Sequence, residues 1–293
     1  MGKWGKRNDG RHGRAPRRFT AYMPMVAHAA VPRPPRVSAR GMAGIVAVGN
    51  WQALTARAGW FHNWTVQGHV DGLAYVPFLW GAGGWGNVAN CLEEAVRVLG
   101  RDYSGRLLWL NEPNDHAQAN IRPEEAVRFY LDTKAAMPHA QLIGPNMSFF
   151  GRDKWQADAN WLRRWHELVV QATGDAPQMA GAAVHNYVQD VPTHIHLHEQ
   201  WRNLLALLGY DKLPLWVTEW GIVNTNPTAE SDTAALTAYY ESHASGVAYH
   251  AYFINADPWV DMGEGNDPFV LRVGLQQQPT FNQLSASGRG WLR

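Results

Sequence analysis

The sequence predicts an α/β fold, a (β/α)8 TIM barrel that forms a single domain. Eight short β-like runs alternate with amphipathic helical stretches from residue 41 onward, which is the pattern of repeated βα units. These units occupy about 250 residues, the length that a closed eight-stranded barrel requires. The chain has 293 residues and 46% hydrophobic content, so it can bury a large core. A doubly wound open sheet is the structural alternative.

The expected elements follow one another in a regular order. We expect strands at Gly44–Val48, Gly59–Trp64, Ala74–Trp80, Arg106–Asn111, Gln141–Gly144, Ala180–Tyr187, Leu215–Trp220 and Val247–Ile254. We expect helices at Trp51–Ala58, Asn87–Leu99, Pro123–Met137, Asp158–Ala172, His194–Leu208 and Ser231–His243. Pro123 lies in the first turn of its helix and acidic residues follow it, as is typical of a helix start.

Residues 1–40 differ in kind from the predicted barrel domain at 41–293. Seven basic residues from Lys3 to Arg18 face a single acid, Asp9, and prolines close the stretch, which predicts a flexible arm. Its short apolar part is broken by Pro24, so it does not form a convincing signal peptide. The localisation therefore stays open.

Composition excludes several classes of function. The formal net charge of +1 gives no general argument for nucleic-acid or membrane binding, and no apolar run is long enough to span a bilayer. A single cysteine, Cys91, excludes an intrachain disulfide and a cysteine-based zinc site. The 15 tryptophans offer flat apolar faces that suit sugar rings, although more than half should simply fill the core.

Polar and aromatic residues gather where the predicted strands end, which is where a barrel builds its active site. The candidates are Asn63, Trp64, Trp80, Asn111, Glu112, Asn146, His185, Tyr187, Glu219, Trp220 and Tyr252. With a strand period of two, Glu112 continues the row of Leu108 and Leu110, and Glu219 continues the row that begins at Leu215. We therefore expect both glutamates to end inward-facing apolar rows. A random surface glutamate fits such a position poorly.

Two carboxyl groups that face each other across a cleft can cleave a glycosidic bond. We expect the apolar approach to Glu112 and the charge of Glu219 to raise the pKa of Glu112, as an acid requires. Hydrogen bonds from neighbours such as Tyr187 would keep Glu219 ionised. This chemistry needs no cofactor and no metal.

The segment Asn-Glu-Pro at 111–113 and the segment Thr-Glu-Trp-Gly at 218–221 resemble the fourth and seventh strand ends of clan A glycoside hydrolases. Four ordered stretches, at 59–64, 76–81, 111–115 and 184–187, resemble family 128, whose members are mostly endo-β-1,3-glucanases. The resemblance implies a retaining enzyme with Glu112 as acid/base and Glu219 as nucleophile.

The resemblance also implies roles for other candidates. Asn111 would bind the 2-hydroxyl of the substrate, Tyr187 would hold Glu219, and His185 would border the cleaved sugar. Trp80 and Trp220 would be stacking floors, and Asn63, Trp64, Asn146 and Tyr252 complete the expected sugar-binding set. The eighth strand lacks the Trp expected at its sugar-binding position, and the third loop is unusually rich in glycine. The sugar therefore stays open, with β-1,3-glucan first and xylan, mannan or β-1,4-glucan as alternatives.

Three other interpretations compete with this one. Gly81–Gly86 is formally the G-x-G-x-x-G dinucleotide fingerprint of an oxidoreductase, but Pro77, Trp80 and Trp85 fit that motif poorly. His194, His196 and His198, with Glu199, could ligate a metal. We expect them instead at the start of a surface helix, where only His194 and His198 align. A barrel that has lost catalysis would bind carbohydrate only. If the chain is a barrel, we expect an oligo- or polysaccharide as its partner, and no nucleic acid or membrane. A polymeric substrate would suit an extracellular protein. We expect the protein to be a monomer.

Overall fold

The computed structural model describes residues 39–44, 56–81, 88–149, 154–253, 272–275 and 278–293. The strands are β1 (Arg40–Ala43), β2 (Trp60–His62), β3 (Ala74–Tyr75), β4 (Phe78–Leu79), β5 (Arg106–Trp109), β6 (Gln141–Phe149), β7 (Gly181–Asn186), β8 (Leu215–Trp220), β9 (Val247–Phe253), β10 (Arg272–Leu275) and β11 (Gln278–Leu284). The helices are α2 (Val88–Leu99), α3 (Pro123–Ala136), α4 (Trp155–Thr173), α5 (Val191–Leu207), α6 (Ala229–Glu241), the 3-10 helix η1 (His243–Ser245) and α7 (Ala286–Leu292).

Nine strands form one sheet in the order β3-β2-β1-β9-β8-β7-β6-β5-β4, and every pair in it is parallel. The expected α/β architecture with a curled parallel sheet is thus confirmed. The two terminal strands of this order, β3 and β4, are parts of the single strand expected at 74–80. The amide of Val76 donates to Phe61 O on β2, and Pro77 O accepts from Leu108 N on β5.

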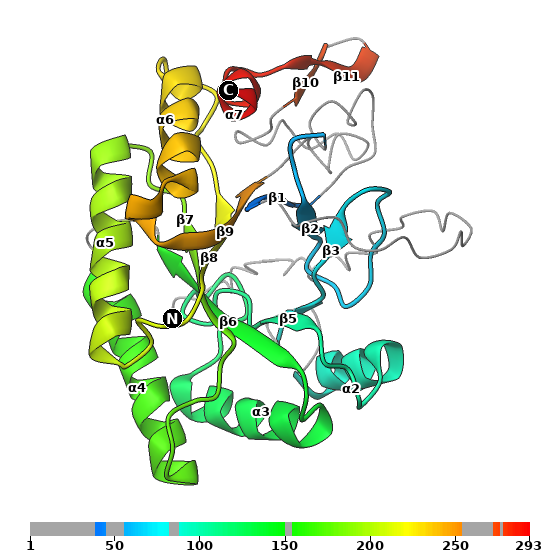
Figure 1. Ribbon diagram of the computed structural model, residues 1–293, viewed down its shortest axis with the longest axis vertical. Coiled ribbons are helices and arrows are strands. Elements are labelled where there is room, and N and C mark those ends of the chain that lie inside the picture. The colour runs from blue at the N-terminus through cyan, green and yellow to red at the C-terminus, as the bar shows by residue number, and fades with distance from the viewer. Residues whose placement is uncertain (1–38, 45–55, 82–87, 150–153, 254–271, 276–277) are drawn as a thin grey trace, which may run out of the picture. The chain divides into compact units, whose positions relative to one another are not determined.

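Two apolar clusters lie on opposite faces of the sheet. The smaller cluster takes its buried members from the sheet segment alone, namely Ala43, Trp60, Val76, Phe78, Leu108, Ile143, Ala183, Trp216 and Ala251. It therefore fills the concave inside of the curled sheet. The larger cluster combines strand residues with helix residues, and Figure 1 shows α3, α4, α5 and α6 following one another along that outer face.

The structure revises several expected boundaries. The first strand is Arg40–Ala43 rather than Gly44–Val48, most of which lies outside the described residues, as does most of the helix expected at 51–58. Arg40 was assigned to the arm but is the buried first residue of β1. The hairpin β10–β11 and the helix α7 were not expected. Within the described ranges, no helix is long and apolar enough to cross a membrane.

Candidate active site

Glu112 follows β5 and reaches the inside of the sheet through strained backbone. Leu108 lies in the inner cluster, as expected, but Leu110 packs in the outer cluster. Leu110 and Glu112 have φ angles of 58° and 44°, a region that non-glycine residues rarely adopt and that concentrates at functional sites. The expectation that Leu110 and Glu112 share an inward row is therefore wrong, because the chain turns between them.

Glu219 reaches the same side through a β-bulge. Leu215 and Val217 belong to the outer cluster and Trp216 to the inner one, so the simple alternation would direct Glu219 outward. Relative to β7 and to β9, however, β8 carries an extra residue between Val217 and Trp220. A bulge of this kind re-aims the side chains that follow it. The expected apolar row was wrong here as well, although the glutamate lies where it was expected to lie.

His185 lies between the two carboxyl groups. Its Nδ1 is 2.8 Å from Glu112 Oε1 and 3.5 Å from Glu219 Oε2. All three side chains are buried, and one ligand atom from each lies within 4.8 Å of the other two. The two glutamates therefore face each other across a short gap at the carboxyl ends of β5 and β8.

Two donors hold the carboxylate of Glu219. Trp64 Nε1 donates to Oε1 at 2.6 Å, and the Tyr187 hydroxyl donates to Oε2 at 2.6 Å. Both donors also contact the ring of Phe253 at the end of β9. Because each oxygen of Glu219 receives its own hydrogen bond, the orientation of this carboxylate is fixed.

The two carboxyl groups have different electrostatic surroundings. Burial, together with the charges of Asp115 and Asp158, raises the pKa of Glu112 to about 8. Burial also raises the pKa of Glu219, but the His185 ring and the hydrogen bonds from Tyr187 and Trp64 oppose that rise. Charge-assisted bonds of this kind favour the ionised form. The environments thus push Glu112 toward the protonated form and support the carboxylate of Glu219.

The comparisons with known proteins identify the family of this chain. A family model described as glycosyl hydrolase catalytic core matches residues 42–268. The chain belongs to the glycosyl hydrolase catalytic core family. No curated protein sequence matches it.

Solved structures of glycoside hydrolase family 128 share the fold of this glycosyl hydrolase. A subgroup I endo-β-1,3-glucanase from Amycolatopsis mediterranei, with laminaritriose and laminaribiose, matches with a TM-score of 0.62 and 21% identity, over 86% of this chain and 98% of that one. A subgroup III curdlan-specific exo-β-1,3-glucanase from Blastomyces gilchristii, with glucose, gives 0.58 and 24%, over 86% and 96%. A subgroup VII oligosaccharide-binding protein from Trichoderma gamsii gives 0.62 and 21%, over 91% and 96%.

Of the other candidates of the hydrolase, Asn111 and Asn146 lie beside Glu112. Asn111 is buried beside Glu112, with its Nδ2 bonded to Gln118 Oε1 and its Oδ1 without a partner among the described residues. Asn146 is fully buried, and its backbone oxygen accepts the amide of Glu112 at 2.8 Å. Asn63 Oδ1 accepts hydrogen bonds from the hydroxyls of Tyr75 and Thr65. Trp80 is half-buried at the end of β4.

Two residues that we expected to bind sugar, Trp220 and Tyr252, are buried away from the site. Trp220 has no exposed surface and packs against Tyr240 of α6, because the bulge turns it to the outer face. Tyr252 is also fully buried, and its hydroxyl bonds to the backbone of Ile222. Neither ring can stack on a sugar. The aromatic residue of β9 nearest the glutamates is Phe253, which the sequence pattern did not single out.

Three further residues, which the sequence analysis did not propose, support the site. His62 and Thr218 are fully buried and bond to each other, His62 Nε2 to Thr218 O at 2.9 Å. Gln189 ties the loop after β7 to the loop after β8, through Tyr187 O, Gly221 O and Val223 N. Thr218 directly precedes a candidate glutamate, and His62 lies in the quoted 59–64 stretch, so both could have been proposed from sequence position.

The glutamate pair and His185 could also hold a metal ion, since their ligand atoms lie within 4.8 Å of one another. A metal-bound histidine normally donates its second ring N–H to an acceptor. His185 Nε2 has no such acceptor among the described residues. The arrangement therefore suits two carboxyl groups that act on a substrate better than it suits a resident metal.

The histidines at the start of α5 do not form a metal cluster among the described residues. The expected helix is present, but His194 and His198 are buried rather than on its surface. His194 bonds to Val188 O and to the Tyr240 hydroxyl, and His198 bonds to Ser245 O. They are core residues. The formal dinucleotide fingerprint at 81–86, which was the rival interpretation, lies almost entirely outside the described residues.

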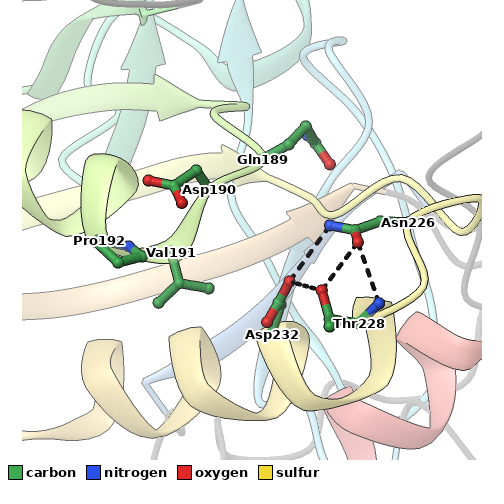
Figure 2. A pocket seen from close by; sticks show the side chains of 7 residues that line it. All are labelled: Gln189, Asp190, Val191, Pro192, Asn226, Thr228 and Asp232. Carbon is green, nitrogen blue, oxygen red and sulfur yellow. Dashed lines mark hydrogen bonds between the residues drawn. The ribbon is translucent and has the colours of Figure 1, made fainter.

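A cavity lies where α5 and α6 begin, and none of the expected site residues lines it. Figure 2 shows its lining, which is Gln189, Asp190, Val191, Pro192, Asn226, Thr228 and Asp232. Asn226 and Thr228 both donate to the Asp232 carboxylate, at 3.3 and 2.6 Å. The lining contains no aromatic ring, so it offers no stacking face for a sugar.

Proposed function

We propose that this glycosyl hydrolase is a retaining clan A enzyme on a closed (β/α)8 barrel that cleaves β-1,3-glucan internally. The observation that carries the proposal is the buried pair of Glu112 and Glu219, with carboxyl oxygens less than 5 Å apart. Retaining glycosidases hold their two carboxyl groups about 5–5.5 Å apart, whereas inverting enzymes need about 6.5–9.5 Å to admit a water. The short gap supports the retaining reaction.

In this reaction Glu112 begins protonated and Glu219 begins ionised. Glu219 attacks the anomeric carbon while Glu112 gives its proton to the departing glycosidic oxygen, which leaves a glycosyl ester on Glu219. Glu112, now a carboxylate, takes a proton from water as that water attacks the anomeric carbon and releases Glu219. Asn111 Oδ1, which has no partner among the described residues, is an acceptor for a substrate hydroxyl. Trp64, which bonds to Glu219, and Phe253, which contacts Trp64, offer aromatic surfaces beside the nucleophile.

The substrate class rests on the comparisons. The solved relatives include endo- and exo-β-1,3-glucanases, some with laminari-oligosaccharides bound. We propose β-1,3-glucan as the substrate and xylan, mannan and β-1,4-glucan as the alternatives. A panel of these polysaccharides, with products identified by linkage and anomeric configuration, tests the proposal. Release of α-configured products first, or hydrolysis of another glycan alone, would overturn it.

A non-catalytic carbohydrate-binding role is the second candidate, because one relative of the same fold is described as an oligosaccharide-binding protein. Glu219→Gln separates the two roles. For the enzyme we expect turnover to fall at least about 10³-fold, since the nucleophile is lost, while laminarihexaose binding measured by calorimetry is retained. A wild-type protein that binds this oligosaccharide and releases no product would favour the binding role.

A further inference from the structure

A layer of polar side chains lies between the apolar inside of the sheet and the glutamates. It consists of His62 on β2, Asn146 on β6 and Thr218 on β8, and each has no exposed surface. Buried polar groups are costly unless they are hydrogen-bonded. The partners that these three side chains take therefore indicate what the layer does.

Asn146 joins the two strands that carry the glutamates. Its Nδ2 donates to Trp109 O at 3.0 Å, and its Oδ1 accepts from the Thr218 hydroxyl at 2.7 Å. Trp109 ends β5 and Thr218 precedes Glu219 on β8, which is separated from β6 by β7 in the sheet order. The bond to Thr218 is therefore not a ladder contact between neighbours but a bridge across the inside of the sheet.

His62 makes a second bridge to the same residue. Its Nε2 lies 2.9 Å from Thr218 O, and β2 is separated from β8 by β1 and β9. Because a carbonyl oxygen can only accept, Nε2 must carry the proton. Thr218 is thus held by its hydroxyl from one side and by its carbonyl from another.

Thr218 and Glu219 are the residues between Val217 and Trp220 where β8 departs from the register of both neighbours. The neighbouring ladders therefore do not fix this part of the strand as they fix regular strand positions. The hydrogen bonds that join Asn146 and His62 to Thr218 hold the strand at this position instead.

We propose that Asn146 and His62 are positioning residues that hold the Thr218–Glu219 bulge, and so set the distance and angle at which Glu219 faces Glu112. This inference rests on the proposed function. In a double displacement the nucleophile must lie close to the anomeric carbon, and a misplacement of about 1 Å can cost 10²-fold in rate.

Substitutions at Thr218 test the proposal. Thr218→Val keeps the shape of the side chain and removes the hydroxyl, so kcat on laminarin should fall about 10–100-fold while KM changes less than about threefold. Thr218→Ser keeps the hydroxyl and should recover most of that loss. His62→Phe, which keeps a ring and loses the N–H, should lower kcat in the same way.

The matched control is Thr237→Val on α6. Thr237 is equally buried and its hydroxyl bonds only to Thr233 O among the described contacts. It should lose similar stability and keep kcat. If Thr218→Val and Thr237→Val have the same kcat, or if Thr218→Ser is as slow as Thr218→Val, the bridges do not position the nucleophile.

Crystal structures of the wild type and of Thr218→Val give a readout that does not depend on activity. We expect the Glu112–Glu219 carboxyl separation to change in the variant. An unchanged separation would overturn the inference. If the wild type shows no turnover on any glycan, the proposed function fails, yet the two structures still decide whether the bridges set the geometry of the pair.

Discussion

At the scale of single residues, the difference between the two glutamates is one of surroundings. Glu112 is buried beside His185, and burial together with the charges of Asp115 and Asp158 favours its protonated form. Glu219 is equally buried but receives two hydrogen bonds. Environments that push two carboxyl pKa values apart are how an active site assigns an acid and a base.

Glu112 should set the alkaline limit of activity. Its pKa of about 8 means that kcat/KM should fall as the pH rises past that value, because the proton for the leaving group is lost. The acid limit belongs to Glu219, which must be ionised to attack. A pH profile of kcat/KM on a soluble laminari-oligosaccharide measures both limits, and an alkaline limit below about pH 6 would contradict the assignment.

The same group gives a stability prediction with a definite sign. The folded pKa of about 8 exceeds the ordinary value of 4.5, so between these values the folded protein binds more protons than the unfolded one. Its free energy of unfolding therefore falls as the pH rises through this window. Glu112→Gln lacks the titrating group, so urea unfolding should show it gaining stability over the wild type from about pH 5 to about pH 8. An advantage that is constant with pH would contradict the burial argument.

Tyr187→Phe should move the acid limit of the profile. Its hydroxyl bonds the ionised form of Glu219 and so lowers the pKa of that carboxyl. Removing it should raise the pKa and shift the acid limit upward by about one pH unit, since a hydrogen bond to a charged group contributes about 1.5–3 kcal/mol. Tyr130→Phe is the control, because the Tyr130 hydroxyl accepts Gln178 N away from the site. A shift of equal size in both variants would remove the specific role.

At the scale of elements, β6 depends on a glycine. Gly144 has φ of 149°, and a Cβ there would lie 2.3 Å from Trp109 O. Gly144→Ala should therefore displace β6 from β5 and cost more than about 2 kcal/mol. Gly174→Ala, at a helix end with φ of 82° and open space around the Cβ, should cost only about 1 kcal/mol. Chemical unfolding of both variants measures the difference, and equal costs would show that the close approach is relieved easily.

Elements were more predictable than the orientation of single side chains. The run Leu215–Trp220 is apolar and β-branched enough to mark β8, and the Asn-Glu-Pro and Thr-Glu-Trp segments mark where strands end beside a site. The bulge in β8 arises from its register with two neighbours, which are distant in sequence, so no local pattern announces it. The prediction that Glu219 faces the inside of the sheet was therefore correct but rested on a wrong strand alternation. Trp220 was also expected on the inside, but it faces α6.

The positions that escaped prediction depend on features that only the folded chain shows. His62 and Thr218 act through partners on strands that are not adjacent, so only the folded sheet brings them together. Leu110 leaves its row because its φ is positive, which a leucine side chain does not predict. Phe253 is the aromatic residue of β9 that contacts Trp64, whereas the sequence pattern led us to propose its neighbour Tyr252 as a sugar-binding residue.

At the scale of the molecule, the first strand is fastened to the last helix. Arg40 of β1 makes two bonds to Glu241 at the end of α6, at 2.7 and 2.9 Å, and donates to Trp291 O of α7 at 2.6 Å. Its guanidinium also lies 5.2 Å from the centre of the Trp291 ring. One side chain thus connects β1, α6 and α7, which are far apart in sequence.

Arg40→Met should therefore destabilise the whole fold rather than a local segment. The Arg40 side chain is 7% exposed and that of Glu241 is 37% exposed, so the pair is partly screened, and we expect a loss of about 2 kcal/mol. Arg97→Met is the matched control, because the pair of Arg97 and Glu94 lies within one helix and is 68% and 49% exposed. Pairs of that kind contribute about 0–1 kcal/mol. Thermal unfolding, followed by circular dichroism and by tryptophan fluorescence, should show one transition shifted downward only in Arg40→Met. A separate early transition in that variant would mean that α7 detaches alone and that Arg40 does not fasten the sheet.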